Sequence, residues 1–187
     1  MATPNVKGSA LNARLGWVRR NHGDDGIHRL MAAVDPATRG ALEEPILKAS
    51  WYPFAVFIDL IESIDRVFGS GDLGLSLVLG RHAAEDNLPT IYRLFFKVGS
   101  PKWVLERATR LWDLHYDSGR MTLEEGVGNH ADLRVTGFAT PHRAHCLSVA
   151  GWTERSVEMS GGVNVRVVET ECRTAGAPVC TLHVSWE

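Results

Sequence analysis

The sequence predicts an α+β fold in a single domain over residues 1–187, with a mainly helical part in residues 1–116 packed on a four-stranded antiparallel sheet in residues 117–187. Two patterns carry this prediction. Apolar residues recur at helical spacing in the first two thirds of the chain, and alternating segments with turn signals dominate the last third. Composition supports one compact unit, because 44% hydrophobic and 22% charged residues are ordinary globular usage and no linker-like segment divides the 187 residues.

The helical part contains several amphipathic segments separated by glycine and proline. Pro53 suits the first turn of one helix, and Ser100 followed by Pro101 is a typical N-cap and first helical position. Gly69 and Gly71 suit the end of another. The expected helices cover residues 10–18, 27–34, 54–68 and 72–87, a segment starting at 89, and residues 101–116.

The last third predicts the order strand, strand, helix, strand, strand. Gly128-Asn129-His130 joins the first two strands, and a turn-rich segment from Arg173 to Pro178 joins the last two. Two hairpins around one helix favour a single antiparallel sheet. The expected elements are strands at 121–127 and 131–137, a helix at 145–159, and strands at 163–171 and 179–186.

All three cysteines of the chain lie in its last forty-two residues together with Glu169. Three thiolates and a carboxylate form a sufficient tetrahedral donor set for zinc, and four protein donors leave no open position for water. Glu169 and Cys172 are three residues apart, so they would face opposite sides of a regular strand; the strand must end or bulge near Cys172. Cys146 would join them from the start of the helix. We therefore expect a structural Zn²⁺ bound by Cys146, Glu169, Cys172 and Cys180.

Three alternatives to this site remain open from the residues alone. The cysteines could be small buried apolar side chains, as isolated free cysteines usually are. His145 could replace Glu169 as the fourth ligand. Cys146 could be a nucleophile with His142 or His145 as base, although sequence neighbours rarely make the required hydrogen bond.

The same segment resembles a known domain. The run from Cys146 to Trp152, the Val168-Glu169-Thr-Glu-Cys172-Arg173 motif, Gly176 and Cys180 are similar to the 4-vinyl-reductase domain, especially in the aromatic-sensing regions of bacterial enhancer-binding activators. The resemblance implies a structural zinc at the matching positions Cys146, Glu169, Cys172 and Cys180.

The upstream part resembles, more loosely, an uncharacterised bacterial paralogous family. The landmarks are Tyr52-Pro53, the segment from Phe68 to Asp72, and Ser100-Pro101. Both resemblances imply the superfamily that also contains heme nitric-oxide sensors and subunits of vesicle-tethering (TRAPP) complexes.

The resemblance implies a pocket between the helices and the sheet. The positions that hold a phenol in the similar aromatic sensors correspond here to Trp103 and approximately Val127, so the polar group for a phenol is missing and an apolar ligand is expected. Candidate lining residues are Trp103, Trp112, Tyr116, Phe138, Phe95 and Phe96.

These observations together predict a non-enzymatic regulatory or sensory domain. It would contain a structural zinc and a pocket for a hydrophobic small molecule, and it would act through a protein partner or a homodimer. An alternative is a scaffold module without ligand, like the vesicle-tethering subunits.

Two further motifs resemble the signatures of cofactor-binding proteins. Tyr116-Asp-Ser118-Gly-Arg120 matches the Tyr-x-Ser-x-Arg motif of the heme nitric-oxide sensors, which makes a heme-based gas sensor a third hypothesis. Only His82 lies near the position expected for the iron ligand. The glycine-rich run from Gly69 to Gly74 matches the dinucleotide fingerprint in letters only, because no strand precedes it.

Charge and hydropathy exclude other classes. Twenty Lys and Arg against 22 Asp and Glu give a nearly neutral chain without a basic run, so nucleic-acid binding is not expected. The N-terminus lacks an apolar signal core, and no apolar segment is long enough for a membrane span. We expect a cytoplasmic protein.

Overall fold

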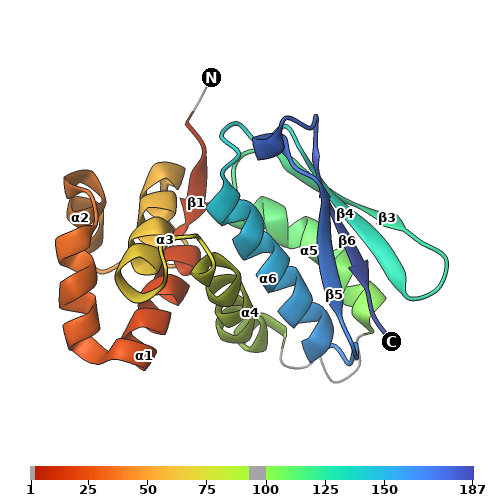
Figure 1. Ribbon diagram of the computed structural model, residues 1–187, viewed down its shortest axis with the longest axis horizontal. Helices are drawn as coiled ribbons and strands as arrows, with labels where there is room; N and C mark the ends of the chain where they lie inside the picture. The colour runs from red at the N-terminus through yellow and green to blue at the C-terminus, as the bar shows by residue number, and fades with distance from the viewer. Residues whose placement is uncertain (1–2, 93–99) are drawn as a thin grey trace.

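The protein has a helical part at one end and an antiparallel sheet at the other, with two helices between them (Figure 1). A computed structural model describes residues 3–92 and 100–187, with the backbone alone at 87–92. Within this part, no helix is long and apolar enough to cross a membrane. The elements in chain order are β1 (Asn5–Lys7), α1 (Gly8–Ala33), α2 (Pro36–Glu43), β2 (Trp51–Pro53), α3 (Phe54–Phe68), α4 (Leu75–Tyr92), α5 (Pro101–His115), β3 (Arg120–Glu125), β4 (His130–Thr136), α6 (Arg143–Met159), β5 (Arg166–Glu171), a 3-10 turn (Arg173–Ala175) and β6 (Cys180–Ser185).

The larger sheet has four antiparallel strands in the order β3-β4-β6-β5, which confirms the predicted α+β class and the strand, strand, helix, strand, strand sequence. One face is apolar: Leu133 of β4 pairs with Leu182 of β6, and both are buried. The register of β5 shifts between Glu169 and Glu171, so the strand is irregular just before Cys172, as the spacing of the two ligand candidates requires.

The helical part agrees with the sequence expectation in α1 and differs from it in two other places. The two helices expected at 10–18 and 27–34 correspond to the two parts of α1, which meet at a kink where Gly23 leaves the helical conformation with φ 64° and ψ −163°. Helix α2 and the small β1–β2 sheet were not predicted, since both are short and their patterns are weak. Helix α4 begins at Leu75 and continues through Pro89, where a new helix was expected.

Helices α4 and α6 cross at unusually close range. A Cβ atom added at Gly80 would lie 2.0 Å from the carbonyl oxygen of Ser148, and one at Gly151 would lie 2.1 Å from that of Leu77. Both distances are far below normal contact, so the crossing depends on glycine at both positions. Helix α6 in turn contacts β5 and β6, and α5 contacts β3. The layer directly on the sheet is therefore α5 and α6, and most of the N-terminal helices pack beyond them.

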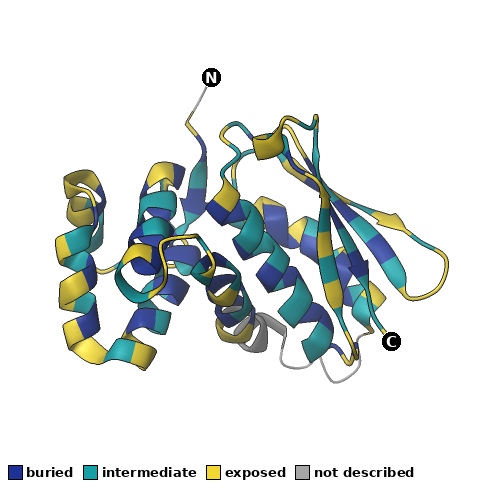
Figure 2. Cartoon of the chain, viewed as in Figure 1, coloured by how far each residue is buried: buried dark blue, intermediate teal, exposed yellow. Residues whose placement is uncertain are grey.

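The core is continuous from the helical part to the inner face of the sheet (Figure 2). Its largest fully buried side chains include Phe57, Leu60 and Ile61 of α3 and Leu11 of α1. Helix α3 has the period expected for a helix with one apolar face, and this face forms the centre of the helical part.

Candidate functional site

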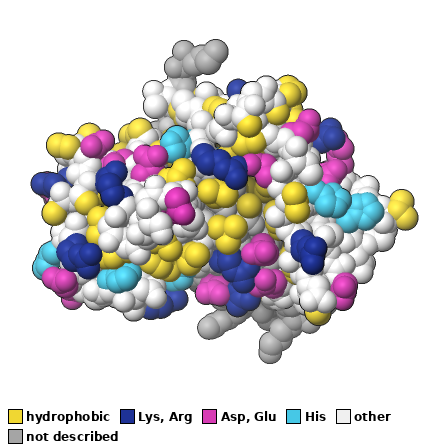
Figure 3. Space-filling view, in the orientation of Figure 1, with side chains coloured by type: hydrophobic (Ala, Val, Ile, Leu, Met, Phe, Trp, Pro, Cys, Tyr) yellow, Lys and Arg dark blue, Asp and Glu magenta, His cyan; other side chains and the backbone are white. Residues whose placement is uncertain are grey.

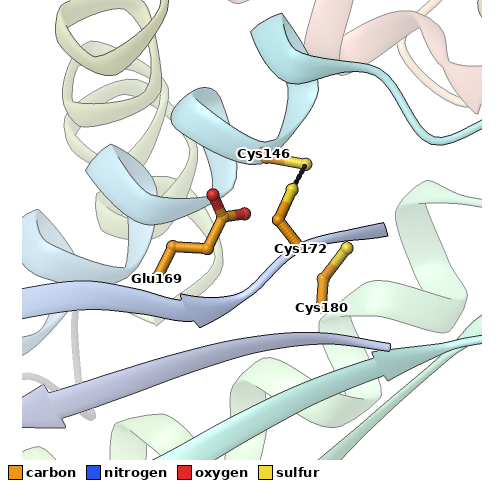
Figure 4. Close-up of side chains that lie close together, drawn as sticks. All are labelled: Cys146, Glu169, Cys172 and Cys180. Carbon is orange, nitrogen blue, oxygen red and sulfur yellow. Dashed lines mark hydrogen bonds between the residues drawn. The ribbon is translucent and has the colours of Figure 1, made fainter. Parts of the chain in front are cut away.

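Four potential metal ligands converge where helix α6 meets the end of the terminal hairpin. The donor atoms of Cys146, Glu169, Cys172 and Cys180 all lie within 4.8 Å of one another. Their side chains point toward a common centre (Figure 4). Cys146 comes from the first turns of α6, Glu169 from β5, Cys172 from the residue after β5 and Cys180 from the start of β6. The sequence prediction named these four residues, and the fold brings all four together.

The hydrogen bonds within the cluster favour the thiolate form of one cysteine, Cys180. A hydrogen bond from Cys146 lowers the pKa of the Cys180 thiol to about 6, and the Arg173 N–H, 3.3 Å from Sγ of Cys180, contributes in the same direction. The same interaction and burial raise the pKa of Cys146. Sγ of Cys172 lies 3.8 Å from Sγ of Cys146. Three sulfur atoms at this separation are close enough to share one cation.

Glu169 is held toward the cluster by an ion pair. Arg143 contacts one carboxylate oxygen, Oε2, while the other, Oε1, is buried and has no hydrogen-bond partner among the described residues. A buried carboxylate oxygen without a donor is costly, and a cation in the cluster would satisfy it.

The alternatives to this donor set are not supported by the geometry. The converging group contains Glu169 and not His145. His145 is instead enclosed by aromatic rings, and its ring centre lies 4.9 Å from that of Tyr116 and 5.0 Å from that of Phe138. His142 accepts a hydrogen bond from the Ala144 N–H, and its Nε2 lies 3.4 Å from Glu62. The hydrogen bond described between Cys146 and His142 is a backbone one, from the Cys146 N–H to the His142 carbonyl at 3.1 Å, and no described hydrogen bond joins either imidazole to the Cys146 thiol, as a nucleophile with a histidine base would require.

A cavity of about 70 Å³ lies between helices α1, α5 and α6, next to Tyr116. The pocket was predicted between the helical part and the sheet; the sheet contributes Met121 of β3 to the wall of this cavity, and its role as a ligand site stays a prediction. Most of its wall is apolar, and its polar groups come from Arg14, Ser148, His115 and Tyr116. The full lining is Ala10, Arg14, Ala83, Ala108, Leu111, Trp112, His115, Tyr116, Met121, Ser148, Val149 and Trp152.

The predicted pocket aromatics divide between this cavity and its surroundings. Trp112 and Tyr116 line it, whereas Phe138 lines a second cavity of about 30 Å³ that reaches the cysteine cluster. Trp103 lines neither cavity; its ring lies under the guanidinium of Arg107 at 4.1 Å. Phe95 and Phe96 lie outside the described residues. Arg14, Ser148 and His115 were not predicted, because single polar residues in helices have no motif.

The loop that contains Tyr116 is fixed by the N-terminus. Val6 of β1 forms a β-bridge with Tyr116, and both the backbone and the side chain of Asn5 donate hydrogen bonds to the carboxylate of Asp117, at 2.6 and 2.7 Å. Burial raises the pKa of Tyr116 to about 12, so its hydroxyl stays protonated at neutral pH. The first residue of the Tyr-x-Ser-x-Arg motif therefore has a fixed position at the cavity.

His115 presents a neutral imidazole at the cavity wall. Its Nδ1 lies 2.8 Å from the carbonyl oxygen of Leu111, which identifies Nδ1 as the protonated nitrogen and leaves Nε2 as an acceptor. Burial lowers the pKa of His115. His82 is also buried with a lowered pKa, and its Nδ1 lies 3.3 Å from Arg20.

The glycine-rich run before α4 is not an anion site. The carboxylate of Asp65, which is buried, accepts hydrogen bonds from the backbone N–H groups of Leu73 and Leu75 at 2.8 and 2.9 Å. The donors that could hold a phosphate at this helix start are already satisfied by the protein.

Solved structures with this fold are H-NOX domains. An H-NOX protein from S. oneidensis in the Fe(II)NO state superposes with a TM-score of 0.76 at 13% identity, covering 97% of this chain and 99% of its own. An H-NOX protein mutant from K. algicida gives 0.71 at 11% identity, covering 97% of this chain and 96% of its own. An oxygen-binding H-NOX domain related to soluble guanylate cyclases gives 0.66 at 10% identity, with 97% and 95% covered. No family model and no curated protein matches the sequence.

The comparisons correct two predictions. A zinc-containing sensor was the leading hypothesis and a heme-based gas sensor the third, but the matching structures are heme-sensor domains, so the order was wrong. Structural zinc was expected as the cofactor, and this prediction is contradicted, because the cofactor named for the structural neighbours is heme. The expected likeness to heme sensors is confirmed for the fold alone.

The described residues do not fit a heme as they stand. The cavity of about 70 Å³ is far below the roughly 300–1,000 Å³ of typical ligand and cofactor pockets. Among the described histidines, His115 is the one that lines this cavity; the Nε2 atoms of His82 and His145 are buried without a hydrogen-bond partner, but neither residue belongs to its wall. Ser118 accepts a hydrogen bond from the Ala139 N–H, and its motif supports the loop between α5 and β3.

Proposed function

We propose that the chain is a ligand-sensing domain built on the H-NOX fold, which responds to a small molecule in the cavity beside Tyr116. One observation carries this proposal: the fold of gas-binding sensor domains extends over 97% of the chain, and in it a cavity joins an apolar wall to a few fixed polar groups. Such a combination is typical of small-molecule sites.

Signalling from this cavity requires a second contact. Helix α6 lines the cavity and also carries Cys146, so occupancy could be transmitted to the end of the hairpin. We propose that a cytoplasmic protein partner or a second copy of the chain receives the signal. A non-enzymatic role agrees with the sensor class of the structural neighbours.

Thermal unfolding in the presence of small molecules tests this function. The panel contains uncharged amides, carboxylates and amines at matched ionic strength, and a sensor cavity should give concentration-dependent stabilisation by at least one class. Ala83→Leu, which fills the cavity wall, should abolish the effect, whereas Ala139→Leu in a loop away from the cavity should keep it. If no compound of any charge stabilises the protein, the proposal fails.

Heme-dependent gas sensing is the second candidate function. The fold of the neighbours and the acceptor Nε2 of His115 favour it, and the size of the cavity opposes it. Heme reconstitution decides between them. A stoichiometric Soret band that His115→Ala removes and His28→Ala keeps would establish heme binding, because His28 is exposed. Absence of the band would leave the heme-free sensor.

We further propose that Cys146, Glu169, Cys172 and Cys180 bind a divalent cation of the kind that accepts thiolates. The convergence of the four donors and the unpaired Oε1 of Glu169 support this, together with the resemblance of the segment to the 4-vinyl-reductase domain. Such an ion would join α6 to the hairpin.

Elemental analysis by mass spectrometry tests the cation site. About one transition-metal ion per chain is expected in the purified protein, lost in Cys172→Ser and retained in the control Thr174→Ala. Thr174 is a suitable control because its hydroxyl lies 3.0 Å from Sγ of Cys172 but is not one of the four donors. Metal-free protein that is stable in chelator would contradict the proposal.

A further inference from the structure

Arg14 is a buried cation that lacks an acidic partner. Its side chain, on α1, is only 4% exposed, and no ion pair joins it to any carboxylate of the described residues. Residues 87–99 cannot provide one, because their sequence contains neither Asp nor Glu. Burial lowers the pKa of Arg14 to about 10, so it still carries its charge at neutral pH.

The groups around this guanidinium are all neutral. Nη2 donates to the hydroxyl of Ser148 at 2.5 Å, Nη1 donates to the carbonyl of Ala10 at 3.3 Å, and the ring of Phe57 lies 4.8 Å from the guanidinium carbon. Nε has no partner among the described residues. Dipoles and a ring face reduce the cost of burying a charge but do not neutralise it. A lone buried charge is therefore expected to mark a place where an anion binds.

The cavity that Arg14 lines has the shape for a short ligand with one charged end. About 70 Å³ corresponds to roughly five to seven water-sized positions. The hydroxyl of Tyr116 provides a further donor near Arg14, whereas Leu111 and Val149 contribute apolar wall. A dianion such as phosphate would leave one negative charge uncompensated against this wall.

We propose that the cavity binds a short-chain monocarboxylate of about four to seven non-hydrogen atoms, with its carboxylate on Arg14 and its alkyl tail against Leu111 and Val149. The inference rests on the proposed function, because it names the ligand class of the same cavity. A guanidinium binds a carboxylate through paired hydrogen bonds, and the apolar wall then accounts for the tail.

Calorimetric titration of the full chain tests this ligand class. The probes are sodium acetate, propionate and butyrate, compared with propionamide and butyramide, and with sodium nitrate as an inorganic anion, all at constant ionic strength. Carboxylates should bind, more tightly as the tail lengthens to butyrate, and the amides of the same shape should bind at least about tenfold more weakly. Equal binding of amides, or binding of nitrate as tight as that of butyrate, would overturn the inference.

Two variants test separately how ligand binding depends on the charge of Arg14 and on the length of the cavity. Arg14→Gln should weaken butyrate binding about tenfold or more, whereas the control Arg19→Gln, an exposed arginine on the same helix, should leave it unchanged. Ala108→Leu keeps Arg14 and shortens the cavity, so it should weaken butyrate more than acetate.

The outcomes also distinguish this inference from the proposed function. If neutral compounds bind and Arg14→Gln has no effect, the cavity is a ligand site but not a carboxylate site, and the inference alone fails. If nothing of any charge binds, the proposed function fails as well.

Discussion

Helix α6 contacts arginine side chains on two sides, toward α4 and toward α1, and the two sides differ in whether an acidic partner is present. Toward α4, Arg81 contacts Glu154 and Glu158, and Arg155 contacts Glu158 and Glu85, so each described cation has an acidic partner. In Figure 3, positive and negative side chains are grouped together over α4 and α6 at the lower centre of the molecule. These ion pairs lie at the surface above the close glycine crossing.

Toward α1, the same helix offers Arg14 only the hydroxyl of Ser148. The side chain of Arg14 is almost fully buried, whereas that of Arg81 is 31% exposed. The partly hydrated arginine has two carboxylates and the buried one has none. The difference teaches that paired arginines here hold two helices together, while the unpaired one is positioned for a group that comes from outside the chain.

A single added methyl group should strongly destabilise the contact between α4 and α6. Gly151→Ala places a Cβ about 2 Å from a backbone carbonyl that cannot rotate away, so we expect a loss of about 3 kcal/mol or more in the free energy of unfolding. Chemical denaturation monitored by circular dichroism measures it. The control is Gly16→Ala in α1, where no atom lies within 4 Å of the new Cβ, and it should be neutral or stabilising by up to about 1 kcal/mol. Equal effects at the two sites would show that the helices do not cross this closely.

Replacing arginine by methionine compares the two faces directly. Arg81→Met should reduce the free energy of unfolding by about 1 kcal/mol, because Glu154 then has no described cation and Glu158 keeps only Arg155. Arg14→Met should cost less or increase stability, because it removes a buried charge that has no counter-ion. The measurement is urea denaturation at low salt without added carboxylate. A larger loss from Arg14→Met than from Arg81→Met would reverse the comparison.

Most of the secondary structure that surrounds these faces could be predicted from the sequence. Helices α3 and α5 and the two hairpins have long, clear periodic patterns, and Ser100 caps α5 through its hydroxyl as expected. The two parts of α1 on either side of Gly23 were also predicted, because their apolar residues form separate periodic runs. Pro89, in contrast, was expected to start a helix but lies within α4.

The two sites differ in how visible they are in the sequence. Cysteine is rare and its spacing is informative, so all four donors at the end of the hairpin were identified. Arg14 is one of 20 basic residues, and its meaning depends on the absence of a carboxylate nearby, which only tertiary structure reveals. The likeness to heme sensors was ranked too low, because the fold is shared at only 13% identity, where few residues reveal it.

Lowering the pH should reduce the free energy of unfolding through His115, the neutral histidine in the wall of the cavity. Burial lowers the pKa of His115 in the folded protein, so the unfolded chain takes up a proton first as pH falls below about 6.5. Stability from this residue is fully present above that pH and is lost progressively below it. Denaturation midpoints of the parent and His115→Gln between pH 7.5 and 5.5 should converge as the pH falls. Parallel curves would mean that His115 takes up its proton equally in both states.

The smallest effect is expected from a single carboxylate on the α4 side. Glu154→Gln leaves Glu158 to pair with Arg81, so the free energy of unfolding should fall by only about 0.5 kcal/mol at low salt. In 1 M NaCl this difference should disappear, because the pair is partly exposed and screened. Glu44→Gln, an exposed position with no described ion pair, should show no change in either buffer. A loss at Glu154 that persists in high salt would mean that its carboxylate is less hydrated than its 26% exposure indicates. The α4 side would then depend on a buried charge, as the cavity side does.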